Sequence, residues 1–196
     1  MVKWEKLPDD IKNDKVRPYY DYLRHKRFSL FLKRGFDVIA AALLVVLLSP
    51  VLVIVAFIIK LEDGGTVFYR QVRITQYGRE FRIFKFRTMV QNADKIGTLV
   101  TVDGDSRITK CGRKIRKCRL DEIPQLFNII SGDMTFVGTR PEVKKYVDGY
   151  DPEMLATLLL PAGVTSEASI TYKDEDEILG VNSKVQLAQA DKILRN

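Results

Sequence analysis

The sequence is poor in metal-binding and oxidisable side chains, with one histidine (His25) and two cysteines (Cys111 and Cys118) in 196 residues. No further pair of cysteines or histidines completes a tetrahedral ligand set, so the sequence does not predict a structural zinc site. The two cysteines leave one disulfide open, but nothing in the sequence indicates an oxidising compartment. The sequence also contains no internal repeat, no GxGxxG and no Walker-type loop, which argues against Rossmann and P-loop folds.

Charged residues are missing from one long stretch, residues 38–59 (VIAAALLVVLLSPVLVIVAFII), which Asp37 and Lys60 bound. A helix rises about 1.5 Å per residue, so this stretch is long enough to cross a hydrocarbon core of about 30 Å. A long polar segment precedes it, and the apolar run is too long for the core of a signal peptide. The sequence therefore predicts association with a lipid bilayer.

Ser49 and Pro50 lie in the middle of this apolar stretch. Proline removes a backbone donor and clashes with the preceding turn, so we expect a kink there. The positive-inside rule places the basic residues on both sides of the stretch in the cytoplasm. A helix broken at Ser49-Pro50 that enters and leaves by one face satisfies both flanks, and the serine hydroxyl then bonds a carbonyl that the proline frees. An ordinary kinked helix that spans the membrane is the alternative.

The formal net charge of +7 at pH 7 indicates an anionic partner, such as a phosphate ligand, a lipid headgroup or a nucleic acid. Residues 1–35 form a basic, aromatic leader. Residues 24–37 (RHKRFSLFLKRGFD), which overlap the end of this leader, predict an amphipathic helix whose cations face lipid headgroups. A soluble helical leader fits these residues as well. The run 107–119 (RITKCGRKIRKCR) is also basic, but no known nucleic-acid motif accompanies it. We therefore expect no nucleic-acid partner.

A β-hairpin is predicted around Gly78. Residues 66–70 alternate as a strand does, and residues 80–87 (EFRIFKFR) intermix apolar and charged side chains. The basic side of this hairpin faces either water or an anion, and the residues fit both arrangements. Residues 91–106 are polar and lack apolar periodicity, which is typical of a surface loop or a lid.

Two adjacent carboxylates, Asp121 and Glu122, lie in the stretch 119–142 (RLDEIPQLFNIISGDMTFVGTRPE), directly after the basic run. Neighbouring acids in a cationic setting suggest chemistry on an anion, in which one acid attacks or holds a metal while the other moves protons or shares that metal. The alternative is an acidic helix N-terminus, where carboxylates favour the helix dipole and Pro124 suits the first turn. The residues by themselves fit both interpretations.

Taken in order, these pieces resemble the bacterial sugar transferases, also called monotopic phosphoglycosyl transferases, over roughly residues 33–170. The ordered set is far more specific than any one of its short motifs. The matching pieces are Lys33-Arg34-x-x-Asp37, the apolar segment with Ser49-Pro50, 84–89 (FKFRTM), 120–128 (LDEIPQLFN), 132–134 (GDM), Val137-Gly138, Arg140-Pro141-Glu142 and 161–165 (PAGVT).

The resemblance implies an α+β fold in three parts. Residues 1–35 are the amphipathic basic leader, and residues 36–60 are a re-entrant, helix-break-helix membrane hairpin broken at Ser49-Pro50. Residues 61–196 are a small, mainly helical catalytic domain with a short β-hairpin, lying against the membrane on the cytoplasmic side. The implied location is the inner membrane of a bacterium.

The resemblance also implies an activity. Family members transfer a phospho-sugar from a UDP-sugar to polyprenyl (undecaprenyl) phosphate, which gives polyprenyl-diphosphate-sugar and UMP in the first membrane step of a glycan pathway. Asp121 matches the nucleophile that forms an aspartyl phospho-sugar intermediate, and Glu122 matches the second acid. Mg²⁺ is shared between these two acids and the diphosphate. The partners implied are therefore the UDP-sugar, the polyprenyl phosphate and the bilayer.

Cations must offset the charge of a diphosphate that a carboxylate approaches. Arg140 matches the family arginine that contacts phosphate, and its planar fork suits two oxygens. Lys85 and Arg87 are the next cations that we place at the phosphates. Ser49 and Pro50 would set the membrane break, which brings Asp121 to headgroup depth.

The chain departs from the family pattern in two places. Many members have a proline where this chain has Thr139, so the nucleotide-side contacts expected of Thr139 and Pro141 differ from the usual ones. Many members also continue with an amphipathic helix, whereas residues 180–196 (GVNSKVQLAQADKILRN) are unfamiliar. A membrane-anchored adaptor with a basic lipid- or partner-binding face is the alternative function. The sequence names neither the sugar nor the pathway, and it is compatible with a homo-oligomer.

Overall fold

The computed structural model describes residues 1–93 and 105–166 of the chain. Most of the predicted loop 91–106 and the unfamiliar tail 180–196 lie outside the described residues. The helices, including short 3-10 turns (η), are η1 (Trp4–Lys6), α1 (Arg17–His25), α2 (Arg27–Asp63), η2 (Gln76–Gly78), α4 (Lys110–Lys117), η3 (Leu120–Glu122), α5 (Gln125–Ser131), α6 (Lys144–Val147) and η4 (Met154–Leu159). The strands are β1 (Phe68–Ile74), β2 (Glu80–Phe86), β3 (Met134–Val137) and β4 (Ala162–Thr165). This mixture of helices and strands confirms the α+β prediction in its general form.

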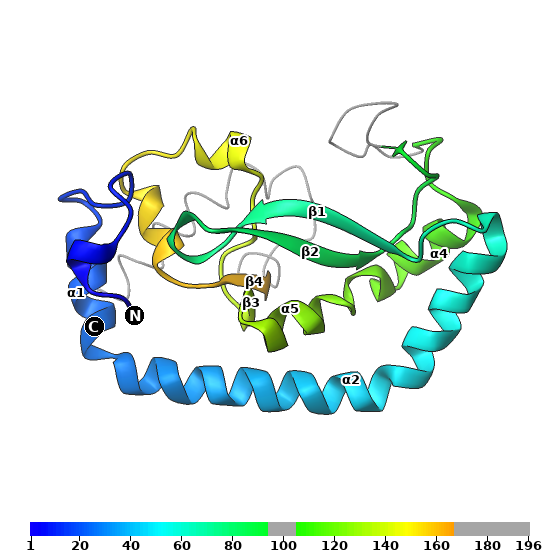
Figure 1. Cartoon of the computed structure of the whole chain (residues 1–196), viewed down its shortest axis with the longest axis horizontal. Coiled ribbons are helices and arrows are strands. Elements are labelled where there is room, and N and C mark those ends of the chain that lie inside the picture. The colour runs from blue at the N-terminus through cyan, green and yellow to red at the C-terminus, as the bar shows by residue number, and fades with distance from the viewer. Residues whose placement is uncertain (94–104, 167–196) are drawn as a thin grey trace.

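The apolar stretch forms the central part of α2, a helix of 37 residues that is long and apolar enough to cross a membrane. Figure 1 shows this helix running along one side of the molecule and then bending toward α4. The helix continues through Ser49 and Pro50, so the predicted break is a bend in a continuous helix. Pro50 has no N–H to offer the carbonyl of Val46, and the Ser49 hydroxyl donates to that carbonyl at 2.8 Å. This confirms the predicted role of the serine.

The first part of α2 is fixed to the rest of the fold by polar contacts. The Asp37 side chain is almost fully buried, and it accepts hydrogen bonds from Lys33 Nζ at 2.9 Å and from the Thr135 hydroxyl on β3. One residue beyond Lys33, the Arg34 guanidinium donates to the carbonyl oxygens of Ile130 at 3.2 Å and Met134 at 3.3 Å. These contacts tie the basic entry of α2 to the end of α5 and to β3.

Both parts of α2 also contribute to the hydrophobic core. Ala41 packs in a buried cluster that β2 and α5 complete, and Val55 and Ile59 pack with Phe86 and Ile115 in a second one. The remaining faces of α2 carry large apolar side chains that are exposed: Phe28, Phe31, Leu32, Phe36, Ile39, Leu43, Val46, Leu47, Val53, Ile54, Phe57, Ile58 and Leu61. An apolar surface of this extent on one helix is typical of contact with lipid.

The predicted hairpin around Gly78 is confirmed. Strands β1 and β2 pair antiparallel, with Phe68 opposite Phe86 and Ile74 opposite Glu80. The turn between them contains Tyr77 and Gly78 in the left-handed region, at φ values of 60° and 72°. Figure 1 shows α5 between this hairpin and the first part of α2.

Strands β3 and β4 form a short parallel pair that joins two motifs distant in the sequence. The pair aligns Thr135 with Gly163, and just beyond it Gly163 lies against Gly138. A Cβ added at Gly163 would lie 2.3 Å from the Gly138 nitrogen and 2.6 Å from its Cα. Glycine at position 163 therefore permits an approach of two backbones that any side chain would block.

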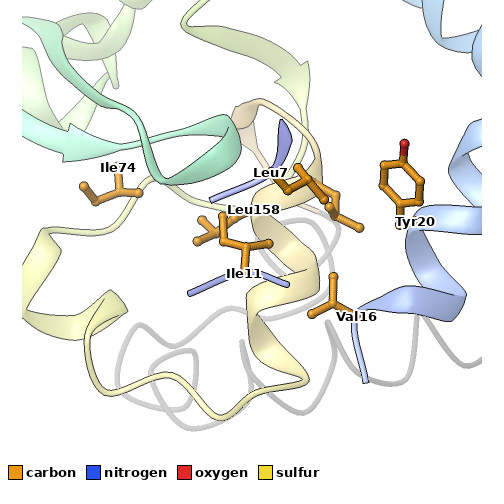
Figure 2. Packing of buried hydrophobic residues seen from close by; sticks show 7 residues of the cluster. Leu7, Ile11, Val16, Tyr20, Ile74 and Leu158 are labelled. Carbon is orange, nitrogen blue, oxygen red and sulfur yellow. The ribbon is translucent and has the colours of Figure 1, made fainter. Parts of the chain in front are cut away.

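The leader packs onto the rest of the protein through a hydrophobic cluster of its own. Figure 2 shows Leu7, Ile11, Val16 and Tyr20 gathered around Leu158 of η4, with Ile74 from the end of β1 nearby. Ile11 and Val16 are fully buried there. These four residues of the leader thus extend the core, whereas Phe28, Phe31 and Leu32 near its end are exposed on α2.

Candidate functional site

The two adjacent carboxylates lie in a short turn of their own. Asp121 and Glu122 belong to η3, which follows α4 in the chain. Arg119 lies between these two helices and reverses the chain direction with a φ of 56°. Pro124 is the N-cap of α5, which begins at Gln125 and has no acidic residue in its first turn. The carboxylates therefore precede α5 and do not serve as its acidic first turn.

Lys85 of β2 faces this turn. Its Nζ donates to Glu122 Oε1 at 2.8 Å, and both side chains are only about a quarter exposed, at 24% and 23%. Burial favours the neutral form of Glu122, but the charge and hydrogen bond of Lys85, with the charges of Arg140 and Arg119, hold the pKa of Glu122 below its ordinary value. Glu122 is thus kept as a carboxylate, and at this position the basic side of the hairpin faces an acid.

Asp121 has a different environment from its neighbour. Its Oδ1 atom is buried and has no hydrogen-bond partner among the described residues. Burial, and then the charge of Glu122, raise the pKa of Asp121, while Lys85 and Arg116 partly oppose that rise. A buried carboxylate oxygen without a partner is costly, and such atoms are commonly found where a ligand or a reaction uses them.

Arg140 is held in place through the backbone on either side of it. The Thr139 carbonyl accepts the Gly163 N–H at 2.7 Å, and the carbonyl of the buried Pro141 accepts from Arg73 Nη1 at 3.2 Å. The Arg140 side chain itself is exposed and makes no hydrogen bond or ion pair with another described residue. The charge of Arg140 helps to lower the pKa of Glu122, and it acts in the same direction on the pKa of Glu142.

Arg87 has a partner away from this turn. Its guanidinium is 93% buried, since 7% of the side chain is exposed, and its Nη2 is ion-paired with Asp63 at the end of α2. Nη1 of the same group has no hydrogen-bond partner in the described part of the chain. The structure thus brings Lys85, Asp121 and Glu122 together, with Arg140 near enough to act on Glu122, and it uses Arg87 to hold α2. A role of Arg87 at the substrate phosphate stays a prediction.

A cavity of about 270 Å³ opens beside the acids. Its polar end is lined by Arg119, Glu122 and Gln125, and the remainder is apolar. The apolar lining comes from α2, from the link between η3 and α5, from α5 itself, and from the paired strands: Leu44, Leu48, Ile123, Leu126, Phe136 and Val164. Sequence reasoning missed this cavity, although Leu44 and Leu48 are spaced four apart and therefore share one face of the helix.

The described residues contain no group of three or more histidine, cysteine, aspartate or glutamate side chains placed to hold a metal ion. Asp121 and Glu122 nevertheless supply two carboxylates, one with an unpaired buried oxygen. Mg²⁺ is commonly bound by one or two carboxylates together with substrate phosphates. The residues therefore fit a magnesium ion whose coordination a phosphate ligand completes.

The family model for bacterial sugar transferases matches residues 28–190. The chain is 46% identical over 124 residues to the UDP-N-acetylgalactosamine-undecaprenyl-phosphate N-acetylgalactosaminephosphotransferase of Aeromonas hydrophila, which covers 63% of this chain but 29% of that relative. It is 40% identical over 158 residues to the exopolysaccharide production protein ExoY of Sinorhizobium fredii, covering 73% of this chain and 70% of the relative. It is also 40% identical over 141 residues, 70% of this chain and 53% of the relative, to the UDP-glucose:undecaprenyl-phosphate glucose-1-phosphate transferase of Caulobacter vibrioides. With its acids, its cavity and its long apolar helix, the chain belongs to the bacterial sugar transferase family.

Proposed function

We propose that this protein transfers a phospho-sugar from a UDP-sugar to undecaprenyl or a related polyprenyl phosphate, through a covalent intermediate on Asp121. The observation that carries the proposal is the buried, unpartnered Oδ1 of Asp121. Its neighbour Glu122 lines the polar end of a cavity that the apolar helix α2 also helps to line. The relatives named as undecaprenyl-phosphate transferases support the same reaction class.

In the first step, an Asp121 carboxylate oxygen attacks the β-phosphorus of the UDP-sugar. A bond forms between that oxygen and phosphorus, and the bond from phosphorus to the bridging oxygen breaks, so that UMP leaves with the bridging oxygen. Lys85 and Arg140 offset the negative charge that gathers there, and the exposed guanidinium of Arg140 has its donors available. Bound Mg²⁺ would supply further charge neutralisation on the phosphates next to Asp121 and Glu122.

In the second step, a phosphate oxygen of the polyprenyl phosphate attacks the same phosphorus. The phosphorus–aspartate bond breaks, the carboxylate is regenerated, and polyprenyl-diphosphate-sugar leaves. We place the first isoprene units of the lipid in the apolar part of the cavity, against Leu44, Leu48 and Phe136. This placement brings the lipid phosphate to the polar end, where Arg119 and Glu122 lie.

We further propose that α2 is re-entrant and that the described domain lies on the cytoplasmic face. Both parts of α2 are fixed to the same domain, the first through Asp37 and Arg34 and the second through Asp63. A straight span would instead place the two ends on opposite sides of the bilayer. In a variant with Cys111→Ser and Asp10→Cys, membrane-impermeant maleimide should label position 10 and the exposed Cys118 from the cytoplasmic side alone. Labelling of position 10 from the outside would contradict re-entry.

The transferase proposal is tested by incubating the membrane-bound protein with a panel of UDP-sugars, undecaprenyl phosphate and Mg²⁺. We expect UMP and a lipid-linked diphosphate sugar from one or a few of these sugars. The adaptor alternative predicts neither product with any sugar, while membrane binding persists. Because the chain spans less than a third of the Aeromonas relative, the panel also shows whether this segment suffices for the complete reaction.

Replacing Glu122 by glutamine should shift the pH dependence of UMP release. Asp121 must be ionised to attack, so the rate falls as the pH drops through its pKa. The Glu122 charge raises that pKa, second only to burial. In Glu122→Gln the pKa of Asp121 therefore falls, and the acid limb of the pH–rate profile moves to lower pH even though the maximal rate also falls. Single-turnover rates from acid to neutral pH measure this shift, with Asp148→Asn as the distant control; an unmoved or raised limb would contradict it.

Filling the cavity should affect the lipid step alone. Leu48 lines the cavity, whereas the adjacent Leu47 is 72% exposed and points elsewhere. We expect Leu48→Trp to raise the KM for undecaprenyl phosphate by about tenfold, as lost or blocked apolar burial of a few methylene groups implies. The lipid-independent burst of UMP should persist, and Leu47→Trp should change neither quantity. Equal effects of the two variants on the KM would contradict the placement of the lipid in this cavity.

A further inference from the structure

A second cavity, of about 350 Å³, lies between the N-terminal segment, α1 and the start of α2. Four cationic and two aromatic side chains line it: Lys3, Arg17, Arg24, Arg27, Trp4 and Tyr20. All of these residues precede residue 28, where the match to the family model begins. The cavity is therefore a feature of the leader, and the transferase chemistry proposed above does not use it.

Most of the positive charge in this cavity is uncompensated. Arg17 is ion-paired with Asp21 at 3.0 Å and lies over the Trp4 ring, 4.6 Å from its centroid. Lys3, Arg24 and Arg27 have no ion pair with any described residue. Glu5 is the one carboxylate that lines the cavity, so three unpaired cations face a single acid there. Such an excess of unpaired cations, two of them guanidinium groups, is typical of a site for a phosphate.

The walls of the cavity are built from packed side chains. Tyr20 is buried in the cluster seen in Figure 2, and its hydroxyl donates to the Val2 carbonyl at 2.9 Å. The Trp4 ring meets Tyr20 edge to face, with their centroids 5.1 Å apart. The Val2 N–H also donates to the Tyr77 hydroxyl at 3.3 Å, which links the segment to the hairpin turn. The N-terminal segment is thereby held over α1, so the walls that Val2, Trp4 and Tyr20 form keep a defined arrangement.

The cavity lies where the apolar surface of the protein begins. Arg27 is the first residue of α2, and the next exposed large apolar side chains on that helix are those of Phe28 and Phe31, at 74% and 73% exposure. A cation that directly precedes a membrane-facing apolar surface lies at headgroup depth. We propose that this cavity binds a phosphate group, and that an anionic phospholipid headgroup supplies it. A soluble phosphate shares the same chemistry, but the position of the cavity next to the exposed apolar side chains of α2 favours a lipid.

Trp4 gives this site its own optical probe, because it is the single tryptophan of the chain and lines the cavity. The protein in detergent is titrated with short-chain phosphatidylglycerol, with short-chain phosphatidylcholine and with inorganic phosphate, while Trp4 fluorescence is recorded. Phosphatidylglycerol should change the emission saturably. The double variant Arg24→Gln/Arg27→Gln should raise its Kd by about tenfold or more, because each cation strengthens binding to an anionic lipid several-fold.

A matched control removes the same charge elsewhere. Arg113→Gln/Lys117→Gln changes two exposed cations on α4, outside the cavity, and should leave the Kd unchanged. If inorganic phosphate gives an equally strong response that the Arg24/Arg27 variant loses, the cavity is a phosphate site. That result would overturn the assignment of the phosphate to a lipid headgroup. The proposal is overturned if phosphatidylglycerol gives no saturable change, if phosphatidylcholine acts equally, or if the two double variants behave alike. Because UMP release is not the readout, these outcomes do not depend on the proposed transferase activity.

Discussion

Asp121→Asn is expected to lower the rate of UMP release by about 10⁴-fold or more, because it removes the atom that attacks phosphorus. The substitution keeps the size of the side chain, and the buried Oδ1 position has no hydrogen bond to lose among the described residues. The fold should therefore survive the change. With UDP-sugar and no lipid acceptor, the wild-type protein should gain the mass of one phospho-sugar, and the variant should gain none.

Asp148→Asn serves as the matched control, because Asp148 is an exposed carboxylate paired only with Lys144 on α6. It should retain the wild-type rate and the covalent adduct. A variant at Asp121 that still forms the adduct would assign the nucleophile to another residue. A variant that loses UMP release while wild type also forms no adduct would instead favour direct transfer from UDP-sugar to lipid.

Asp63→Ala is expected to lower the free energy of unfolding by about 3–5 kcal/mol, as the loss of one partner of a buried ion pair does. The Arg87 guanidinium is 93% buried, with 7% of the side chain exposed, and Asp63 is the ion-pair partner that the structure gives it. Its Nη1 already lacks a hydrogen bond and lies under the backbone, 2.1 Å from where a Cβ at Gly65 would be. Removing Asp63 leaves this cation buried and unpaired. Unfolding in denaturant, followed in detergent by circular dichroism, measures the change.

Substitution of the other partner of this ion pair should lower the free energy of unfolding by less. Arg87→Met leaves Asp63, which is 30% exposed and can regain water, and it fills the space with an apolar chain. We therefore expect Asp63→Ala to destabilise more than Arg87→Met. The opposite order would contradict the view that the cost comes from leaving the Arg87 charge buried and unpaired. Protection of wild type, but not of Arg87→Met, by UDP-sugar would support the predicted contact of Arg87 with a substrate phosphate.

The parts of the fold that local chemistry controls were predictable from the sequence. Glycine at position 78 between alternating segments placed the hairpin, since a turn there needs positive φ. Pro50 frees the carbonyl four residues before it, and a neighbouring hydroxyl is the nearest donor, so the bond from Ser49 to Val46 followed. Adjacent acids followed by Pro124 located the candidate site. Each of these predictions depends on residues close together in the chain.

Features that depend on distant contacts were not predictable. Lys85 and Arg87 were both placed at the substrate phosphates, as the cations next in line after Arg140. Strand β2 ends at Phe86, however, and the next residue is free to pair with Asp63 across the fold. The cavity beside Glu122 likewise needs walls from α2 and β4 at once. The burial of Ile11 and Val16 beneath η4 could not be foreseen in a leader that is polar and basic overall.

The way α2 is built into the core has a practical consequence for making this protein without a membrane. An anchor that only tethers a domain can be cut away to leave a soluble fragment. Here Ala41, Val55 and Ile59 of that helix are core residues, and Asp37 fills a polar niche beneath β3. Deleting the helix would expose the apolar residues that remain in both clusters to water, so such a fragment would aggregate. A water-soluble version would instead keep the helix and exchange its exposed apolar side chains, from Phe28 to Leu61, for polar ones.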